Sequence, residues 1–142
     1  MDIKDHIGKI WDEKTTSQTV KHNWWQEPRV VSHIDQKVCG SVAKFISCHF
    51  PDMTFKKGIS IGCGNGSKEM TLVESGLVES FELYELSIKR IESGRKLASA
   101  RGLSSKVSFI YGDAFLLASD GRYDFVYWHD ALHHMSNTIA AL

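Results

Sequence analysis

Three glycines at alternate positions, Gly62, Gly64 and Gly66, stand between a short apolar run and a segment with helical spacing. Glycine adopts positive φ angles without strain, and its lack of a side chain lets a ligand lie directly against the backbone. The N–H groups at the start of a helix favour polar or anionic ligand groups. The whole turn, including Cys63 and Asn65, is therefore a candidate ligand cradle, with a plain tight turn as the alternative.

Two acidic residues follow the turn at the ends of later apolar runs. Glu85 stands 19 residues after Gly66, and its carboxylate could accept hydrogen bonds from both hydroxyls of a ribose. Asp113 could accept a hydrogen bond from an exocyclic amine while the Ala114 backbone addresses a ring nitrogen. Glu82 lies inside a run, where we expect it to be solvated or paired. Taken singly, each candidate has a plain alternative, either a carboxylate facing water or a common Gly-Asp turn.

Histidines gather near the end of the chain at His129, His133 and His134. Histidine titrates near neutral pH, so His133 or His134 could take a proton from a hydroxyl or an amine. A metal cluster is one alternative to this general-base role. Structural or substrate-lining positions at the start of a helix are another.

The elements that must position these residues alternate between strands and helices. Short apolar runs predict strands at 58–61, 81–85, 107–111 and 123–128. One helix is expected over 67–75 and another from residue 88 to a stop at Gly102, with Ser87 as its cap. This alternation predicts an α/β fold with a Rossmann-like parallel sheet and flanking helices. Its ligand crevice would lie beyond the carboxyl ends of the strands.

The segment before the first strand carries weaker signals. The polar run 12–19 predicts a loop or a mobile arm. Apolar residues spaced three and four apart from residue 30 to residue 46 predict a helix of about five turns. Trp24 and Trp25, just ahead of it, could cover a cation with their aromatic faces or pack under the helix.

Composition bounds the class of protein. The 142 residues, 42% hydrophobic and 24% charged, predict one domain, with 1–56 as an N-terminal helical segment and 57–142 as the ligand-binding half. Seventeen basic and seventeen acidic residues cancel, which disfavours nucleic acid as a partner. We expect no membrane partner, because no tract approaches the roughly 20 apolar residues of a membrane span. Without a signal-peptide pattern or Cys-x-x-Cys spacing, we expect a cytoplasmic protein with no metal site.

From about Lys57 onward, the chain resembles a class I S-adenosylmethionine-dependent methyltransferase. The signature turn of that family is an acidic residue, one further residue, then Gly-x-Gly-x-Gly, and residues 60–66 match it with Ser60 in the acidic position. The resemblance implies binding of S-adenosylmethionine, its conversion to S-adenosylhomocysteine, and methylation of a small-molecule substrate.

The resemblance also implies individual roles. In the family, the acid at position 60 helps to hold the methionine amino group, so Ser60 weakens this contact or leaves it to water and backbone carbonyls. By the same resemblance Glu85 would hold the ribose and Leu86 would pack on adenine. Asp113 and Ala114 would read the adenine edge.

Many small-molecule methyltransferases of this fold have a segment similar to Trp128–Met135 after the fourth strand. The resemblance places His129 in the cofactor site, with His133 and His134 near the transferable methyl group. Methyl transfer does not strictly require a base, because a sulfonium is already activated and alignment supplies much of the rate.

The family sheet has seven strands, and this sequence supplies four, expected in the order third, second, first, fourth. We expect either a fragment truncated after the fourth strand or a chain that self-associates through that bare edge. A non-catalytic or fragmentary S-adenosylmethionine-binding domain is one alternative function. An NAD(P)-dependent oxidoreductase is another, although its fingerprint would place glycine where this chain has Ser67.

Overall fold

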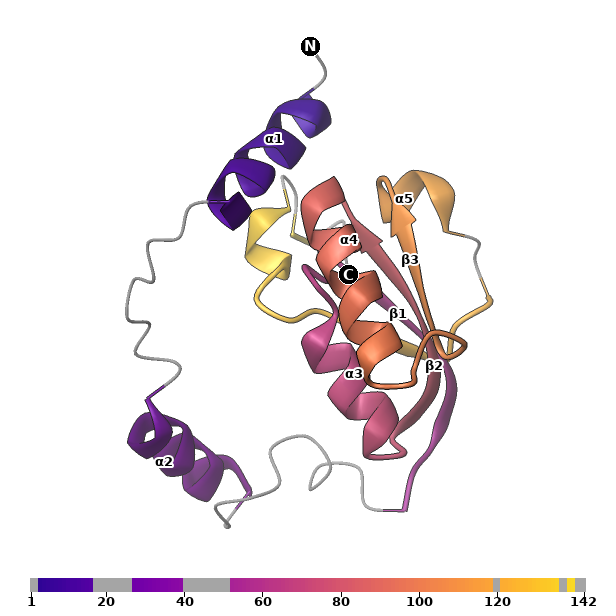
Figure 1. The fold of residues 1–142 in the computed structure, drawn as a ribbon. Coiled ribbons are helices and arrows are strands. Elements are labelled where there is room, and N and C mark those ends of the chain that lie inside the picture. Colours follow the sequence, from indigo (N-terminus) through magenta and orange to yellow (C-terminus); the bar gives the residue numbers. More distant parts are fainter. Residues whose placement is uncertain (1–2, 17–26, 40–51, 119–120, 136–137, 140–142) are drawn as a thin grey trace. The chain divides into compact units, whose positions relative to one another are not determined.

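The fold is that of a computed structural model of the chain, which describes residues 3–16, 27–39, 52–118, 121–135 and 138–139 (Figure 1). The chain divides into two compact units. One unit comprises Met1–Ser17 with Thr54–Leu142, and the other comprises Gln18–Met53. The first helix therefore belongs to the same unit as the sheet, and the extent of a single domain stays a prediction.

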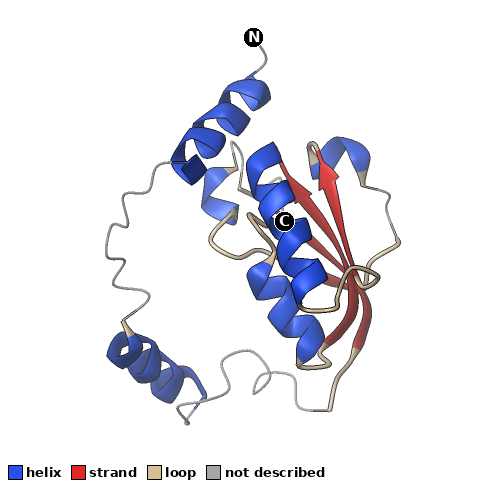
Figure 2. Ribbon diagram, viewed as in Figure 1, coloured by secondary structure: helices blue, strands red, loops and turns tan. Residues whose placement is uncertain are grey.

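Four strands form one parallel sheet in the order β3-β2-β1-β4 (Figure 2). They are β1 (Phe55–Ile61), β2 (Val78–Glu85), β3 (Val107–Tyr111) and β4 (Phe125–Tyr127). The predicted Rossmann-like class and strand order are confirmed. Both β1 and β2 begin three residues earlier than predicted, because Phe55 and Val78 already pair with each other. Strand β4 is shorter than predicted.

Two helices cover one face of the sheet, α3 (Ser67–Glu74) and α4 (Ile88–Ala100), and Figure 1 shows them side by side. Their buried apolar residues, with those of the strands beneath, form the core on this face. Ser87 caps α4 as predicted, because its hydroxyl accepts a hydrogen bond from the Arg90 N–H at 3.2 Å. Two short helices follow the later strands, α5 (Ala114–Leu117) and η2 (Leu132–His134).

The N-terminal segment is a helix, α1 (Ile3–Thr16), so the loop predicted from residue 12 is wrong as far as Thr16. The rest of that polar run lies outside the described residues. The polar residues are helical because they contact another part of the fold. The Asp12 carboxylate accepts hydrogen bonds from the Ser87 hydroxyl and from the Lys89 N–H at the start of α4. Polar residues that predict a loop by themselves thus hold the helix against its neighbour.

The second unit contributes one described helix, α2 (Pro28–Cys39), with proline in the first turn, where it is tolerated. This agrees with the predicted start of the long helix. Its predicted continuation to residue 46, and the pair Trp24 and Trp25, lie outside the described residues. No helix within the described ranges is long and apolar enough to cross a membrane.

Side-chain contacts fix the amino-terminal part of the sheet. Glu82 is paired, as expected, with the Lys57 ammonium at 2.6 Å, with Arg122 at 3.1 Å and with the Tyr123 hydroxyl. Burial raises the pKa of Glu82, but hydrogen bonds from Lys57 and Tyr123 outweigh it and hold this pKa below its usual value. Asp124 accepts the backbone N–H groups of residues 56 and 57 at 2.8 Å each, which fixes β4 beside β1.

Candidate functional site

The loop between β1 and α3 has the backbone conformation that its glycines predict. Gly62, Gly64 and Gly66 have φ angles of 70°, 62° and 70°. A side chain in this left-handed region costs about 1–2 kcal/mol. A Cβ added at Gly66 would also lie 2.8 Å from side-chain atoms of Leu83 and Phe109. The loop is therefore seated directly on the core at the carboxyl end of β1.

Glu85 ends β2 and turns its carboxylate onto this loop. Its Oε2 accepts the Gly64 N–H at 2.8 Å, and its Oε1 accepts the N–H groups of Leu86 and Ser87 at 2.8 and 2.9 Å. The side chain is 5% exposed. A carboxylate has about four acceptor positions, so these three donors leave room for one more. The structure brings Glu85 and the glycine loop together, and contact with a ribose stays a prediction.

A second buried carboxyl lies under the loop, on α3. The Ser60 hydroxyl donates to Oε1 of Glu69 at 2.6 Å, and the two residues are 0% and 1% exposed. Among the described residues, Oε2 of Glu69 has no hydrogen-bond partner. Burial raises the pKa of Glu69, against the lowering effect of the Ser60 hydrogen bond. Sequence reasoning missed Glu69. The signal that could have found it is an acidic residue on the same short helix as several buried apolar residues.

Asp113 caps α5 and also contacts the N-terminal helix. Its Oδ1 accepts the Phe115 N–H at 3.0 Å, and its Oδ2 accepts a hydrogen bond from the Lys4 ammonium of α1. Ala114 is buried in an apolar cluster with Ile59 and Tyr84. Asp113 thus lies at the expected strand end, but part of its hydrogen-bonding capacity is already used. The pairing with Lys4 joins residues 109 positions apart, which no local pattern reveals.

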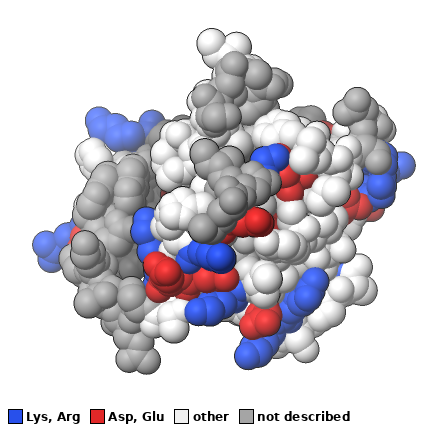
Figure 3. Space-filling model, turned by 90° about the horizontal axis from the view of Figure 1, so that it is seen from above, with Lys and Arg blue, Asp and Glu red and all other residues white. Residues whose placement is uncertain are grey.

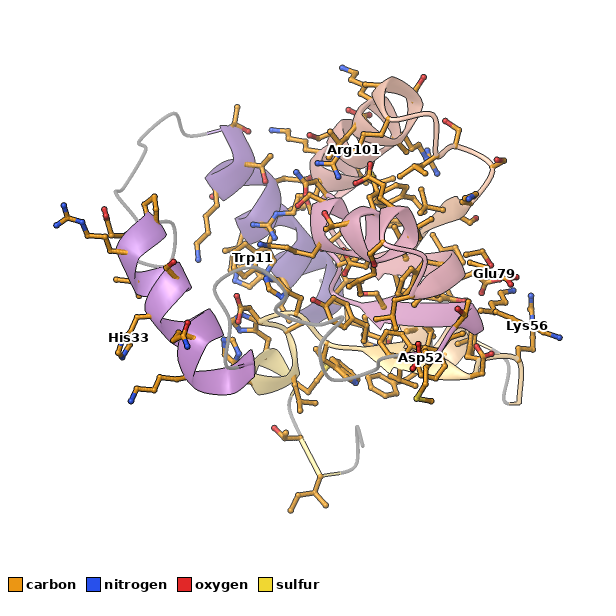
Figure 4. The ribbon with its side chains drawn as sticks, turned by 90° about the horizontal axis from the view of Figure 1, so that it is seen from below. Trp11, His33, Asp52, Lys56, Glu79 and Arg101 are labelled. Atoms are coloured by element: carbon orange, nitrogen blue, oxygen red, sulfur yellow. The ribbon has the colours of Figure 1, made fainter. Side chains whose placement is uncertain are left out.

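Helix α1 passes over the residues expected to contact adenosine. A Cβ added at Gly8 would lie 2.4 Å from the Leu86 carbonyl oxygen, so the helix touches the end of β2 there. Trp11 lies beside α4 and η2 (Figure 4), with the Arg90 guanidinium 4.3 Å from its ring centre and the His134 ring at 5.7 Å. The helix therefore covers part of the predicted site.

The loop after β4 adjoins the glycine loop, since a Cβ added at Gly62 would lie 3.0 Å from that of Ala131. His129 in this loop has its Nδ1 3.2 Å from the Tyr127 hydroxyl and its Nε2 3.5 Å from the Asp130 carboxylate. Burial lowers the pKa of His129, and Asp130 opposes that shift. The loop that carries His129 is thus close to the glycine loop, as the resemblance implies.

His133 and His134 lie in η2 with exposed side chains and ring centres 3.9 Å apart. Burial lowers the pKa of His134, and the neighbouring His133 and Lys14 lower it further. A neutral imidazole of this kind can accept a proton. His134 also lines a hollow of about 260 Å³ together with Ile7, Ile10, Trp11 and Lys14.

Other chemistries find less support. Burial raises the pKa of the Cys63 thiol well above its usual value, and Glu69 and Glu85 raise it further, so this thiol is a poor nucleophile. Within the described ranges, no three His, Cys, Asp or Glu side chains are placed to hold a metal ion. In Figure 3, acidic and basic side chains are intermingled on the visible face, without the basic patch that nucleic acid favours.

Comparison with known proteins places these features in context. The model of a family described as "methyltransferase domain" matches residues 59–142. A protein named probable tocopherol O-methyltransferase, chloroplastic, from Oryza sativa subsp. japonica is 35% identical over 81 residues. That match covers 56% of this chain and 22% of the rice protein, so the chain spans about a fifth of that relative.

Solved structures share the fold. The [4+2]-cyclase SpnF has a TM-score of 0.66 at 17% identity, covering 95% of this chain and 52% of the cyclase. A methyltransferase from Geobacter sulfurreducens, solved in complex with S-adenosyl-L-homocysteine, has a TM-score of 0.53 at 20% identity. It covers 62% of this chain and 36% of the other. At these identities the likeness extends to the fold alone.

Proposed function

The chain belongs to the methyltransferase domain family, and from that premise we propose that it forms the S-adenosylmethionine-binding part of an enzyme that methylates a small molecule. The observation that carries the proposal is the Glu85 carboxylate, held at the end of β2 against the Gly64 N–H. A bare glycine backbone and an acid with one free acceptor position meet there. This pair suits a nucleoside, because the remaining acceptor position can take a hydrogen bond from one ribose hydroxyl.

The residues present fit the rest of that ligand. Glu69 keeps an unpartnered carboxylate oxygen beneath the same loop. Asp113 and Ala114 stand at the end of β3, where the adenine edge is expected, and Leu86 follows Glu85. When bound, S-adenosylmethionine supplies a methyl group on a positively charged sulfur. The work left to this chain is to hold the nucleoside, orient the acceptor and exclude water.

On the acceptor side, we assign the proton-accepting role to His134 or His133. A neutral His134 faces the largely apolar hollow between α1 and η2, which would suit an apolar small molecule with one polar group. The rice relative is named as an O-methyltransferase, an enzyme that methylates an oxygen atom. Hydroxyl compounds are therefore the first class of acceptor to test.

Two other functions compete with this one. A binding domain without turnover is favoured by the uncharged Ser60 at the acidic position of the signature, and the cyclase with the same fold shows that the fold does not fix the reaction. An NAD(P)-dependent oxidoreductase would also use a glycine turn and an acid, but the glycine pattern of residues 62–66 is not its fingerprint.

Calorimetric titration of the chain with S-adenosylhomocysteine, with NAD as the comparison ligand, tests the cofactor. Selective binding of S-adenosylhomocysteine is the expected result, and preference for NAD would overturn the proposal. Transfer of a radiolabelled methyl group to a panel of hydroxyl and amine compounds then separates an enzyme from a binding domain.

A further inference from the structure

Beneath the glycine loop, Glu69 presents one carboxylate oxygen for which the described residues offer no partner. Its Oε1 accepts the Ser60 hydroxyl at 2.6 Å, while Oε2 is buried without a hydrogen bond. A buried carboxylate with an unmatched oxygen carries a desolvation cost that a hydrogen-bonded cation would offset. Such an atom next to a ligand cradle indicates a missing positive partner.

The groups around this carboxyl do not supply that partner. Ser60 on β1 and Tyr127 on β4 are neutral, and Cys63 in the loop is a protonated thiol. Glu85 on β2 adds a second negative charge, which raises the pKa of Glu69. Lys68, on the same helix, lowers the pKa of Glu69, but its own side chain is exposed.

Building on the proposed function, we propose that Oε2 of Glu69 binds the α-ammonium group of the methionine portion of S-adenosylmethionine. The ammonium would supply the absent positive charge and up to three N–H donors. Ser60 is then a positioning residue, because its hydroxyl fixes Oε1 and leaves Oε2 for the ligand. The uncharged Ser60 thus no longer argues against cofactor binding, since α3 supplies the carboxylate from nine residues further along the chain.

The glycine loop lies against the loop that follows β4. Ala131, in the loop after β4, packs against Gly62, and Asp130 beside it has a positive φ of 52°.

The test compares two ligands on the 142-residue chain by calorimetry. S-adenosylhomocysteine carries the ammonium, and 5′-methylthioadenosine keeps the nucleoside but lacks the amino-acid portion. Glu69→Gln keeps the shape and removes the charge, and Glu74→Gln, on the exposed side of the same helix, is the matched control. We expect Glu69→Gln to lower the affinity for S-adenosylhomocysteine roughly tenfold or more and to leave the affinity for 5′-methylthioadenosine unchanged. The control variant should bind both ligands as the unmodified chain does.

The other outcomes are distinct. Unchanged affinity of Glu69→Gln for S-adenosylhomocysteine would overturn the inference, and so would an equal loss for both ligands, which marks a structural role. If the unmodified chain binds neither ligand, the proposed function itself fails, and this inference with it.

A second measurement needs no variant. Because burial raises the pKa of Glu69, binding of an ammonium there should release a proton from the fraction of chains that carry one. Titrations at mildly acidic pH in buffers of different ionisation enthalpy should show this release for S-adenosylhomocysteine and none for 5′-methylthioadenosine. Equal proton release for the two ligands would contradict the inference.

Discussion

The backbone N–H of Gly64 donates to the Glu85 carboxylate at 2.8 Å across 21 residues of sequence. This hydrogen bond joins the loop after β1 to the end of β2, two neighbouring strands of the sheet. The same carboxylate also accepts the N–H groups of Leu86 and Ser87. It therefore links the loop between β1 and α3 to the turn between β2 and α4. The Glu85 carboxylate therefore helps to fix the shape of the glycine loop.

Glu85→Gln should lower both stability and ligand affinity. A glutamine is uncharged and has one carbonyl acceptor, so all three backbone donors would lose a charged partner and at least one would lose its acceptor. We expect the free energy of unfolding to fall by about 1–3 kcal/mol. Affinity for S-adenosylhomocysteine should fall roughly tenfold or more. Urea unfolding and calorimetry measure the two, and an unchanged affinity would exclude Glu85 from the site.

Glu79→Gln is the control for that experiment, since Glu79 lies on the same strand with its side chain exposed (Figure 4). It should change neither quantity.

Gly66→Ala should destabilise the chain more than Gly76→Ala. The two glycines have nearly the same φ, 70° and 77°, so the backbone strain of an alanine is similar. Only at Gly66 would the new Cβ meet the core, 2.8 Å from Leu83 and Phe109, whereas nothing lies within 4 Å at Gly76. The difference between their free energies of unfolding measures the close packing of the loop. Equal losses would mean that the loop relaxes away from the core.

Gly8→Ala should loosen α1. In an isolated helix this change stabilises by about 0.5–1 kcal/mol, but here the Cβ would lie 2.4 Å from the Leu86 carbonyl oxygen. We expect faster amide hydrogen exchange in α1 and at the start of α4. His6→Ala, at an exposed position of the same helix, should leave exchange unchanged. Slower exchange in Gly8→Ala would show that α1 does not rest on β2.

The pH dependence of stability should reveal the buried Glu69. Burial raises its pKa in the folded chain above the ordinary value of 4.5, so the unfolded chain releases this proton at lower pH than the folded chain does. The contribution of Glu69 to the free energy of unfolding is therefore lost as the pH rises from 4.5 through the raised pKa of the folded chain. Glu69→Gln should be more stable than the unmodified chain at neutral pH, by a margin that shrinks toward pH 4.5. Urea unfolding across this range tests it, and a margin independent of pH would contradict the assignment.

Strand β4 should mediate self-association. Within the described ranges it pairs with β1 on one side only, and Val126 on it is 57% exposed. Exposed apolar edge strands favour pairing with a second chain. Sedimentation at rising concentration should show oligomers that Val126→Lys reduces and Leu116→Lys, on α5, does not. A monomer at all concentrations would count against this edge as an interface.

Local patterns predicted the parallel sheet and placed the glycine loop and Glu85 at the ends of neighbouring strands. They could do so because apolar runs and glycine turns are properties of residues that are close in sequence. Ser87 was identifiable as a cap for the same reason. The pattern failed at Asp12, whose polar neighbours indicate a loop until α4 provides a partner. Glu69 escaped detection because its unpartnered oxygen is defined only in space. Lys4 and Asp113 pair across most of the chain, where spacing carries no information.

Whether the crevice binds a nucleoside through Glu85 is tested most directly by a crystal structure of the chain with S-adenosylhomocysteine. One ribose hydroxyl should lie about 2.6–3.0 Å from a Glu85 carboxylate oxygen, with adenine beside Leu86 and Asp113. A ligand bound elsewhere would contradict the assignment of the site, and so would a ribose out of hydrogen-bonding reach of Glu85.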